Sequence, residues 1–276
     1  MSKSNLLLKS GAKIAGAISK LAADSIIPGS SFFSELGAES LGVFIESSLE
    51  EMADRMLSNS EKARIGAAGS FAISLVRERL MNGDKLRNDD FFFSNNENYR
   101  SNAEEIFEGV LLKCKAEHQE RKIKYISSIF ANVAFTNASI SEANQVLKIA
   151  ENLTHRQLCI LSVIRTLMVN RDLIRVLRNT SENSPNSSYI YILQETMELF
   201  QMGLIFQIFP SDNEDSVTEE RYDEALLSND FTPLMSWDQI FPSGLVLSSI
   251  GMSCYSLMNL SDISTYELDE TIKALS

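Results

Sequence analysis

The chain has 276 residues, 44% of them hydrophobic, which suffices for one large or two modest cores and excludes wholesale disorder. The formal net charge is −12, and residues 201–276 hold 13 acidic and 2 basic side chains, a local net of −11. Because such a surface repels a phosphate backbone, nucleic-acid binding through this C-terminal region is disfavoured.

The first predicted helix covers residues 5–27 and is amphipathic. Lys9, Lys13 and Lys20 share one face, and an apolar set lies opposite them. This pattern fits a helix docked on its own domain or in a partner's groove, and it also fits a helix lying on a membrane surface. The three lysines are therefore candidate partner-binding residues, with docking on protein favoured over lipid.

Four further helical stretches are predicted from residue 31 onward in the N-terminal region. One covers residues 31–57, and the next begins near Ser60, as its cap, and ends at Asn82-Gly83. Ser101 with Glu104 has the spacing of a capping box and opens a long helical pattern, to about residue 135, that can break near Arg121. Ser141 opens another short helix.

The polar segment 84–100 is predicted to be a loop, and it contains Phe91, Phe92 and Phe93. These rings are either an exposed anchor for a partner or a plug that fills the helical core from the surface, and we favour the plug. They are retained as candidate partner-binding residues.

The second half of the chain mixes helices with short apolar runs. Thr154 and Gln157 form another capping-box pair before a helix. A helix over residues 189–202 ends at Gly203, and a β-like run follows at 204–209. An acidic stretch at 211–224 precedes a second strand at 244–247, a helix at 248–259 and a last helix from about Ser264. The fold class is mainly α: a helical N-terminal bundle (1–150), then an α+β region with a small β-hairpin (151–276).

Three segments resemble a winged-helix domain of the multiple-antibiotic-resistance type of regulator. They are Leu153–Leu161 at a helix opening, Met197–Ile205 at a helix that closes on Gly and enters a strand, and Leu247–Gly251 at the turn after the wing. The resemblance implies a winged-helix fold and DNA binding. Residues 179–220, however, contain no Lys or Arg, and five acids stand at the wing position, so the DNA-binding face has the wrong sign.

The N-terminal half looks similar to helical prokaryotic proteins of no assigned activity, some of them found beside phage-defence genes. The stretches that carry this resemblance are Ser60–Ala67 and Ala103–Phe135. It implies a role in antiviral defence.

The sequence contains no pattern that indicates catalysis, a cofactor or a metal. Cys114 and His118 are four apart on a predicted helix, but a zinc site needs two more ligands, so independent packing is favoured. Glu104, Glu105 and Glu108 fit an acidic first turn better than a metal cluster. The basic stretch 113–124 is read as a solvated, ion-paired helix face. Three separate cysteines indicate buried thiols in a reducing compartment.

These observations predict a non-enzymatic interaction or assembly subunit, an adaptor or a sensor, that acts with a protein partner or as a homo-oligomer. One alternative is a winged-helix DNA-binding regulator. Another is a membrane-associated effector that acts through residues 1–27. No apolar run approaches the roughly 18 residues of a membrane span, so the expected location is cytoplasmic, with peripheral membrane attachment as the alternative.

Overall fold

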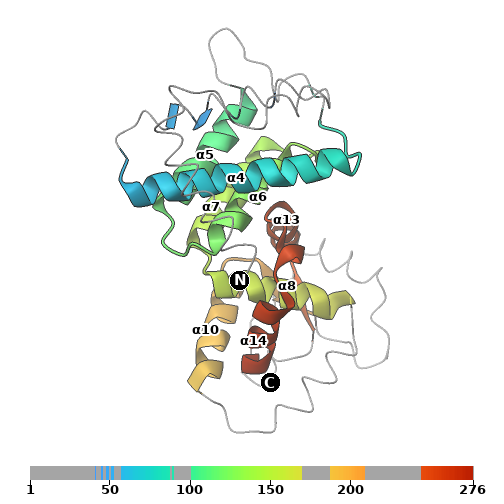
Figure 1. Ribbon diagram of the computed structural model, residues 1–276. Helices are drawn as coiled ribbons and strands as arrows, with labels where there is room; N and C mark the ends of the chain where they lie inside the picture. The colour runs from blue at the N-terminus through green and yellow to red at the C-terminus, as the bar shows by residue number, and fades with distance from the viewer. Residues whose placement is uncertain are drawn as a thin grey trace. The chain divides into compact units, whose positions relative to one another are not determined.

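The computed structural model describes residues 57–87, 89, 101–169, 187–208 and 244–275, and also 41, 45, 48, 49, 51 and 52. This part of the chain is mainly helical and contains a two-stranded antiparallel sheet (Figure 1), which confirms the predicted fold class. Its elements are α4 (Asn59–Met81), α5 (Asn102–Ala116), α6 (Lys122–Val133), α7 (Ile140–Asn152), α8 (His155–Val169), α10 (Ser187–Gln201), β1 (Ile205–Gln207), β2 (Leu245–Leu247), α13 (Ser249–Leu257), the 3-10 helix η1 (Leu260–Asp262) and α14 (Thr265–Leu275).

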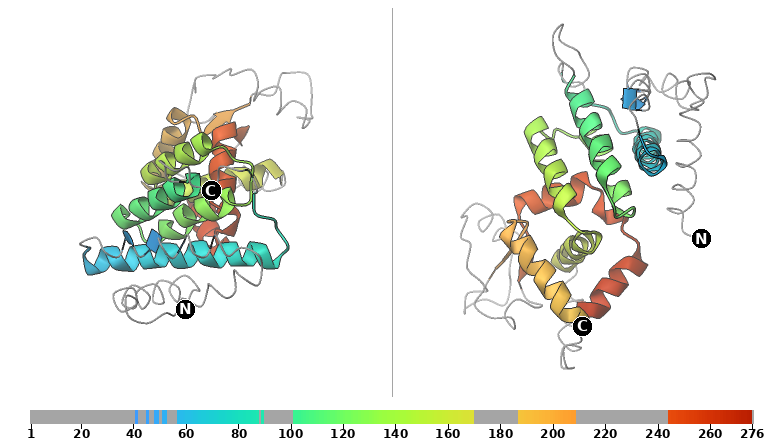
Figure 2. Two further views of the ribbon diagram at one scale, coloured as in Figure 1. Left: turned by 90° about the horizontal axis from the view of Figure 1, so that it is seen from above. Right: turned by 90° about the vertical axis from the view of Figure 1, so that its left-hand side faces the viewer.

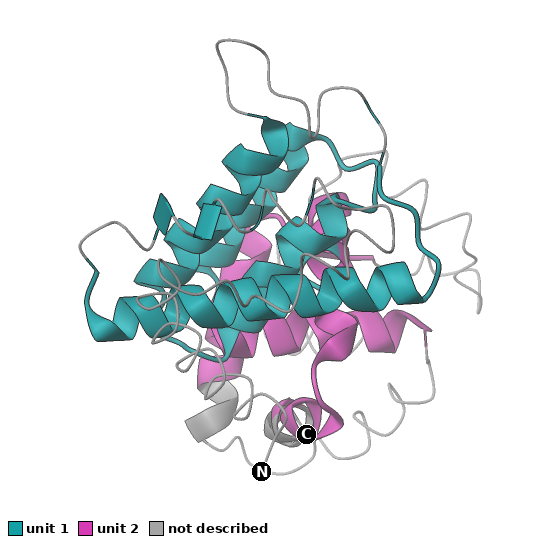
Figure 3. Cartoon of the chain, turned by 45° about the horizontal axis from the view of Figure 1, so that its top comes forward, with its two compact units in different colours: residues 1–153, 257–259 teal, residues 154–256, 260–276 magenta. Residues whose placement is uncertain are grey.

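The chain divides into two compact units, shown in separate colours in Figure 3. Unit 1 comprises residues 1–153 with 257–259, and unit 2 comprises residues 154–256 with 260–276. The boundary expected from the sequence, between residues 150 and 151, lies close to the point at which unit 2 begins.

Helix α6 is the centre of unit 1. Of its twelve residues, all except Lys124 are buried, and α4, α5 and α7 each pack against it. In Figures 1 and 2, α5, α6 and α7 lie on the same side of the long α4. The rings of Phe107 and Phe130 join α5 to α6, with centroids 4.6 Å apart. The helix therefore buries polar as well as apolar side chains, and the buried polar ones include Lys122, Ser127 and Asn132.

Serine side chains cap the starts of α4, α5 and α7 in unit 1. At α4, Ser58 Oγ accepts from Glu61 N, and the Glu61 carboxylate accepts from Ser58 N. The predicted cap, Ser60, was therefore wrong, because it lies inside the helix. The same holds at α7, where Ser139, and not Ser141, accepts from Glu142 N. Each correct cap stands three residues before a glutamate, the spacing that completes a capping box.

The predicted break near Arg121 is confirmed, because α5 ends at Ala116 and α6 begins at Lys122. The other predicted capping box of unit 1 is confirmed as well: Ser101 Oγ accepts from Glu104 N, and the Glu104 carboxylate accepts from Ser101 N.

At the other end of α6, Asn132 Nδ2 donates to Leu257 O at 3.0 Å, which holds residues 257–259 within unit 1.

In unit 2, α10 leads through a tight turn into the sheet. Gly203 has a φ of 69° and ends the helix, as predicted, and β1 then pairs antiparallel with β2 in the register Ile205–Leu247, Phe206–Val246 and Gln207–Leu245. Both predicted strands are thereby confirmed. Helix α8 packs against β2, α10 and α14, and α10 also contacts α14.

Gly251 allows α13 to approach the sheet. A Cβ atom at this position would lie 2.0 Å from Leu204 O. The contact is organised by Ser248, whose N donates to Leu204 O and whose Oγ donates to Gly203 O. Only a residue without a side chain fits there.

Candidate functional site

The candidate partner-binding residues named from the sequence lie outside the described residues. This holds for Lys9, Lys13 and Lys20 and for Phe91, Phe92 and Phe93, and it holds for the acidic stretch 211–224. Their roles therefore stay predictions, and the site has to be built from other side chains.

Cys114 and His118 do not form a pair. Helix α5 ends at Ala116, so the two residues do not share a helix face. Cys114 is fully buried against Ile123 O and Ser127 Oγ, whereas the His118 side chain is 85% exposed. Burial raises the pKa of the Cys114 thiol to about 12, so it is protonated at neutral pH and is a poor metal ligand or nucleophile.

The stretch 113–124 is not a continuous solvated face, and that expectation was wrong. Lys113 and Lys115 make surface ion pairs with Glu151 and Glu61. Lys122 is instead 2% exposed, and its Nζ lies 2.6 Å from Glu117 Oε2. The chain turns between the two residues, so their charges meet inside unit 1 and not on a helix surface.

Glu117 accepts hydrogen bonds from three directions at this turn. Its carboxylate accepts from Gln119 N at 2.7 Å and from Lys122 Nζ, and its carbonyl oxygen accepts from Arg64 Nη1 at 3.0 Å. Lys122 Nζ also donates to Glu151 O at 3.3 Å. These bonds tie α4, α5, α6 and α7 together, which is a structural task and not a catalytic one.

A second polar cluster surrounds the start of α8 in unit 2. The predicted capping box is confirmed: Thr154 N donates to Gln157 Oε1 at 2.8 Å, and Gln157 N donates to Thr154 Oγ1 at 3.1 Å. Both side chains also reach α10, where Thr154 Oγ1 donates to Glu195 and Gln157 Nε2 donates to Glu198 Oε2 at 2.7 Å. Arg156 pairs with the Glu195 carboxylate, and this partner raises the pKa of the guanidinium.

His155 joins the same cluster to α14. Its Nε2 lies 3.4 Å from Glu267 Oε1, and its Nδ1 lies 3.9 Å from Cys159 Sγ. A thiol, an imidazole and a carboxylate in sequence are the groups of a nucleophilic triad. The thiol-bearing residue Cys159 is only 2% exposed, however, so a substrate cannot reach it. The contacts therefore connect α8 to α14.

The sequence analysis missed this contact, although His155 and Cys159 stand four apart on a helix, a spacing that places them on one face. Glu267 is more than a hundred residues away in the chain, and no local pattern points to it.

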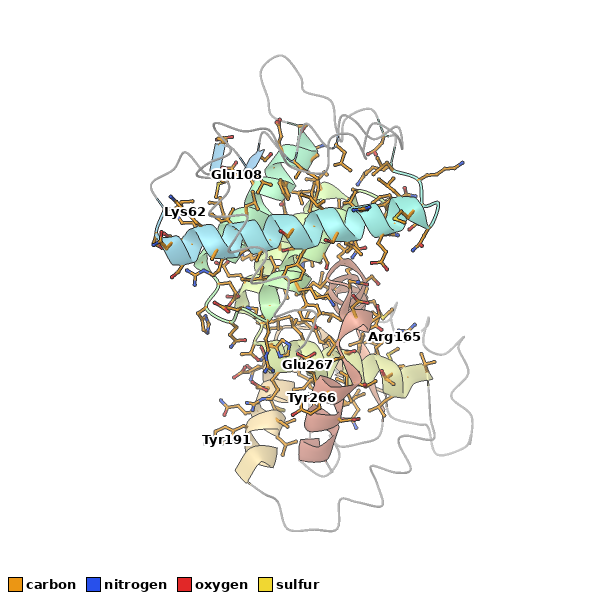
Figure 4. All side chains as sticks on the ribbon, viewed as in Figure 1. Lys62, Glu108, Arg165, Tyr191, Tyr266 and Glu267 are labelled. Carbon is orange, nitrogen blue, oxygen red and sulfur yellow. The ribbon has the colours of Figure 1, made fainter. Side chains whose placement is uncertain are left out.

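The exposed face of α10 carries a distinctive set of side chains. Tyr191 is 60% exposed, and Gln194, Gln201 and Met202 are also exposed. These four residues recur at helical spacing. The opposite face of the helix is buried, and it carries Ile192, Leu193, Thr196 and Leu199. The helix contains no Lys or Arg. Figure 4 shows Tyr191 projecting from α10, and it shows Tyr266, which is 69% exposed, on the neighbouring α14.

Among the described residues, no group of three or more His, Cys, Asp or Glu is placed to hold a metal ion. In the same part of the chain, no helix is both long and apolar enough to cross a bilayer. Comparison of the chain with protein-family models, curated proteins and solved structures found no match.

Proposed function

We propose that this protein is a non-enzymatic interaction or assembly subunit that binds a protein partner through unit 2. The observation that carries this proposal is the exposed face of α10, which presents Tyr191, Gln194, Gln201 and Met202 without any basic side chain. Tyrosine and methionine are enriched at protein interfaces, and tyrosine is one of the residues that dominate binding energy there.

The polar cluster at the start of α8 supports this assignment. Glu195 and Glu198, which stand between Gln194 and Gln201 along α10, are already bonded to Arg156 and Gln157. The α10 face is therefore held in place before a partner arrives. A preorganised surface loses less conformational entropy on binding, which favours a stable complex.

The order of elements in unit 2 favours a DNA-binding regulator as a second candidate. Unit 2 contains, in chain order, two helices, a glycine turn, two paired strands and a further helix. This is the order that led to the winged-helix resemblance. A helix that reads DNA needs donors for phosphates and bases, usually Arg or Lys. Because α10 has neither, this candidate ranks second.

Two further parts of the proposal rest on sequence alone. A role in antiviral defence rests on the resemblance of residues 60–67 and 103–135 to prokaryotic defence-associated proteins. Attachment to a membrane rests on the lysine face of residues 1–27, which lie outside the described residues.

The experiment that tests the proposal is a pull-down of the tagged full-length protein from its native host, with and without nuclease. We expect a protein partner in stoichiometric amount that is retained after nuclease treatment. Recovery of nucleic acid alone, together with duplex binding that weakens steeply with salt, would instead establish the DNA-binding candidate. Recovery of the protein alone in the membrane fraction would contradict both candidates.

A further inference from the structure

The two most exposed aromatic side chains of the described residues flank one polar cluster in unit 2. Tyr191 stands one helical turn before Glu195, whose carboxylate contacts Arg156 at the start of α8. Tyr266 directly precedes Glu267, whose carboxylate contacts His155, the residue next to Arg156. Two contacts, Glu195 with Arg156 and Glu267 with His155, therefore join α10 and α14 to adjacent residues at the start of α8. Figure 4 labels both tyrosines, one on α10 and one on α14.

This surface, defined by the exposed side chains of Tyr191, Tyr266 and Asp269 and called here the tyrosine surface, lies on negatively charged helices. Helices α10 and α14 contain five carboxylates and one lysine, a net of −4. Adding Arg156, which Glu195 already pairs, leaves −3. Asp269 is exposed on α14.

We infer that the tyrosine surface binds an arginine- or lysine-rich segment of a partner protein. This inference rests on the proposed function and names the chemistry of the partner. An exposed tyrosine ring offers its face to a guanidinium or an ammonium group, and neighbouring carboxylates attract the same cation. A phosphate backbone, by contrast, is repelled by the net charge of these helices.

A peptide titration tests this inference with the full-length protein. The probe is a fluorescently labelled, synthetic amphipathic helix with arginines on its polar face, and the comparison peptide has glutamate in place of each arginine. We expect the arginine peptide to bind at least about 10-fold more tightly, with an affinity that falls as salt is raised.

Substitutions then locate the binding site. Because both rings are more than half exposed, Tyr191→Ala with Tyr266→Ala should leave folding intact, as circular dichroism can verify. This double variant is expected to bind the arginine peptide about 10-fold more weakly, in the range of a lost interface hot spot. The Tyr191→Phe, Tyr266→Phe variant keeps both rings and is expected to retain affinity. Met81→Ala, which removes a side chain 67% exposed in unit 1, is the matched control and is expected to bind normally.

Three results would overturn the inference. They are equal binding of the two peptides, undiminished binding by the double alanine variant, and self-association of the wild-type protein that disappears in this variant. The last result would identify a second copy of the chain as the occupant. The pull-down keeps the two proposals apart: capture of the same partner by wild-type and double alanine proteins refutes the tyrosine surface alone, whereas capture of no partner by either refutes the proposed function.

Discussion

Replacing Lys122 with methionine tests whether the buried ion pair holds unit 1 together. Methionine is unbranched and only one atom shorter than lysine, so the change removes the ammonium group and its hydrogen bonds without opening a large cavity. It leaves the Glu117 carboxylate, on a side chain 5% exposed, with Gln119 N at 2.7 Å as its remaining close donor and with His118 Nδ1 at 3.4 Å. Breaking one side of a buried pair costs about 3–5 kcal/mol, and the remaining donors favour the lower end of that range.

A double-mutant cycle separates the pair from its surroundings. Glu117→Gln is expected to cost a similar amount, because the buried ammonium group of Lys122 is then left with neutral acceptors alone, the new amide oxygen and Glu151 O at 3.3 Å. The double variant Glu117→Gln, Lys122→Met is expected to cost less than the sum of the two single changes by at least about 2 kcal/mol, since neither charge is left alone. Lys113→Met breaks the surface pair with Glu151, in which both side chains are partly exposed, and is expected to cost less than about 1 kcal/mol.

Urea unfolding followed by circular dichroism gives the free energies, and hydrogen exchange of residues 102–133 reports on unit 1 directly. The local measurement is needed because a chain of two compact units need not unfold in one step. If Lys122→Met stays within about 1 kcal/mol of the wild type, or if Lys113→Met costs as much, the buried pair does not stabilise the turn and the reasoning is refuted.

Four further predictions concern two glycines, the buried thiols at neutral and at high pH, and Glu267. Gly251→Ala is expected to disrupt the contact between α13 and Leu204, because its Cβ would lie 2.0 Å from a backbone oxygen. Gly109→Ala is expected to lower the stability less, because the atom 2.8 Å from its Cβ is the flexible end of the Leu147 side chain. Faster hydrogen exchange at residues 204–208 in the first variant alone checks this ordering. Burial raises the pKa of Cys114 and Cys254 to about 12, so both thiols are expected to resist iodoacetamide at pH 8 until urea unfolds the chain; rapid labelling of the native protein would contradict this. A thiol in the unfolded chain ionises near pH 8.5, so above about pH 9 only the unfolded chain loses these protons. The free energy of unfolding is therefore expected to fall as pH rises toward 12. The fall is expected to be less steep in a Cys114→Ala variant. Glu267→Gln is expected to raise hydrogen exchange across α14. The change removes the carboxylate that contacts His155 and that accepts a hydrogen bond from Ser264 Oγ at 2.7 Å, so both interactions become weaker.

Local signals predicted the elements well and the caps unevenly. The break before Lys122, the strands at 205–207 and 245–247 and the two capping boxes at Ser101 and Thr154 followed from residue spacing. The caps of α4 and α7 were placed two residues too late, although a glutamate three residues after Ser58 and Ser139 marks the true positions.

Tertiary contacts could not be predicted from the spacing of residues along the chain. A lysine in a charged stretch is normally solvated, and nothing local shows that Lys122 turns inward toward Glu117. The contact between His155 and Glu267 joins two distant parts of the chain, so it depends on how α14 packs against α8.

The winged-helix resemblance and the proposed partner surface of unit 2 share Gln201 and Met202, but the resemblance also includes buried residues. The motif from Met197 to Ile205 includes Leu199, Leu204 and Ile205, which are fully buried, and the glycine that ends α10. Such residues specify how a helix enters a strand, and they are compatible with many functions. The proposed partner surface is on the other face of α10, where Tyr191 and Gln194 are exposed. Buried positions of this kind bear on the fold and not on the ligand, and the exposed face supports the proposal of a basic protein segment over DNA as the ligand.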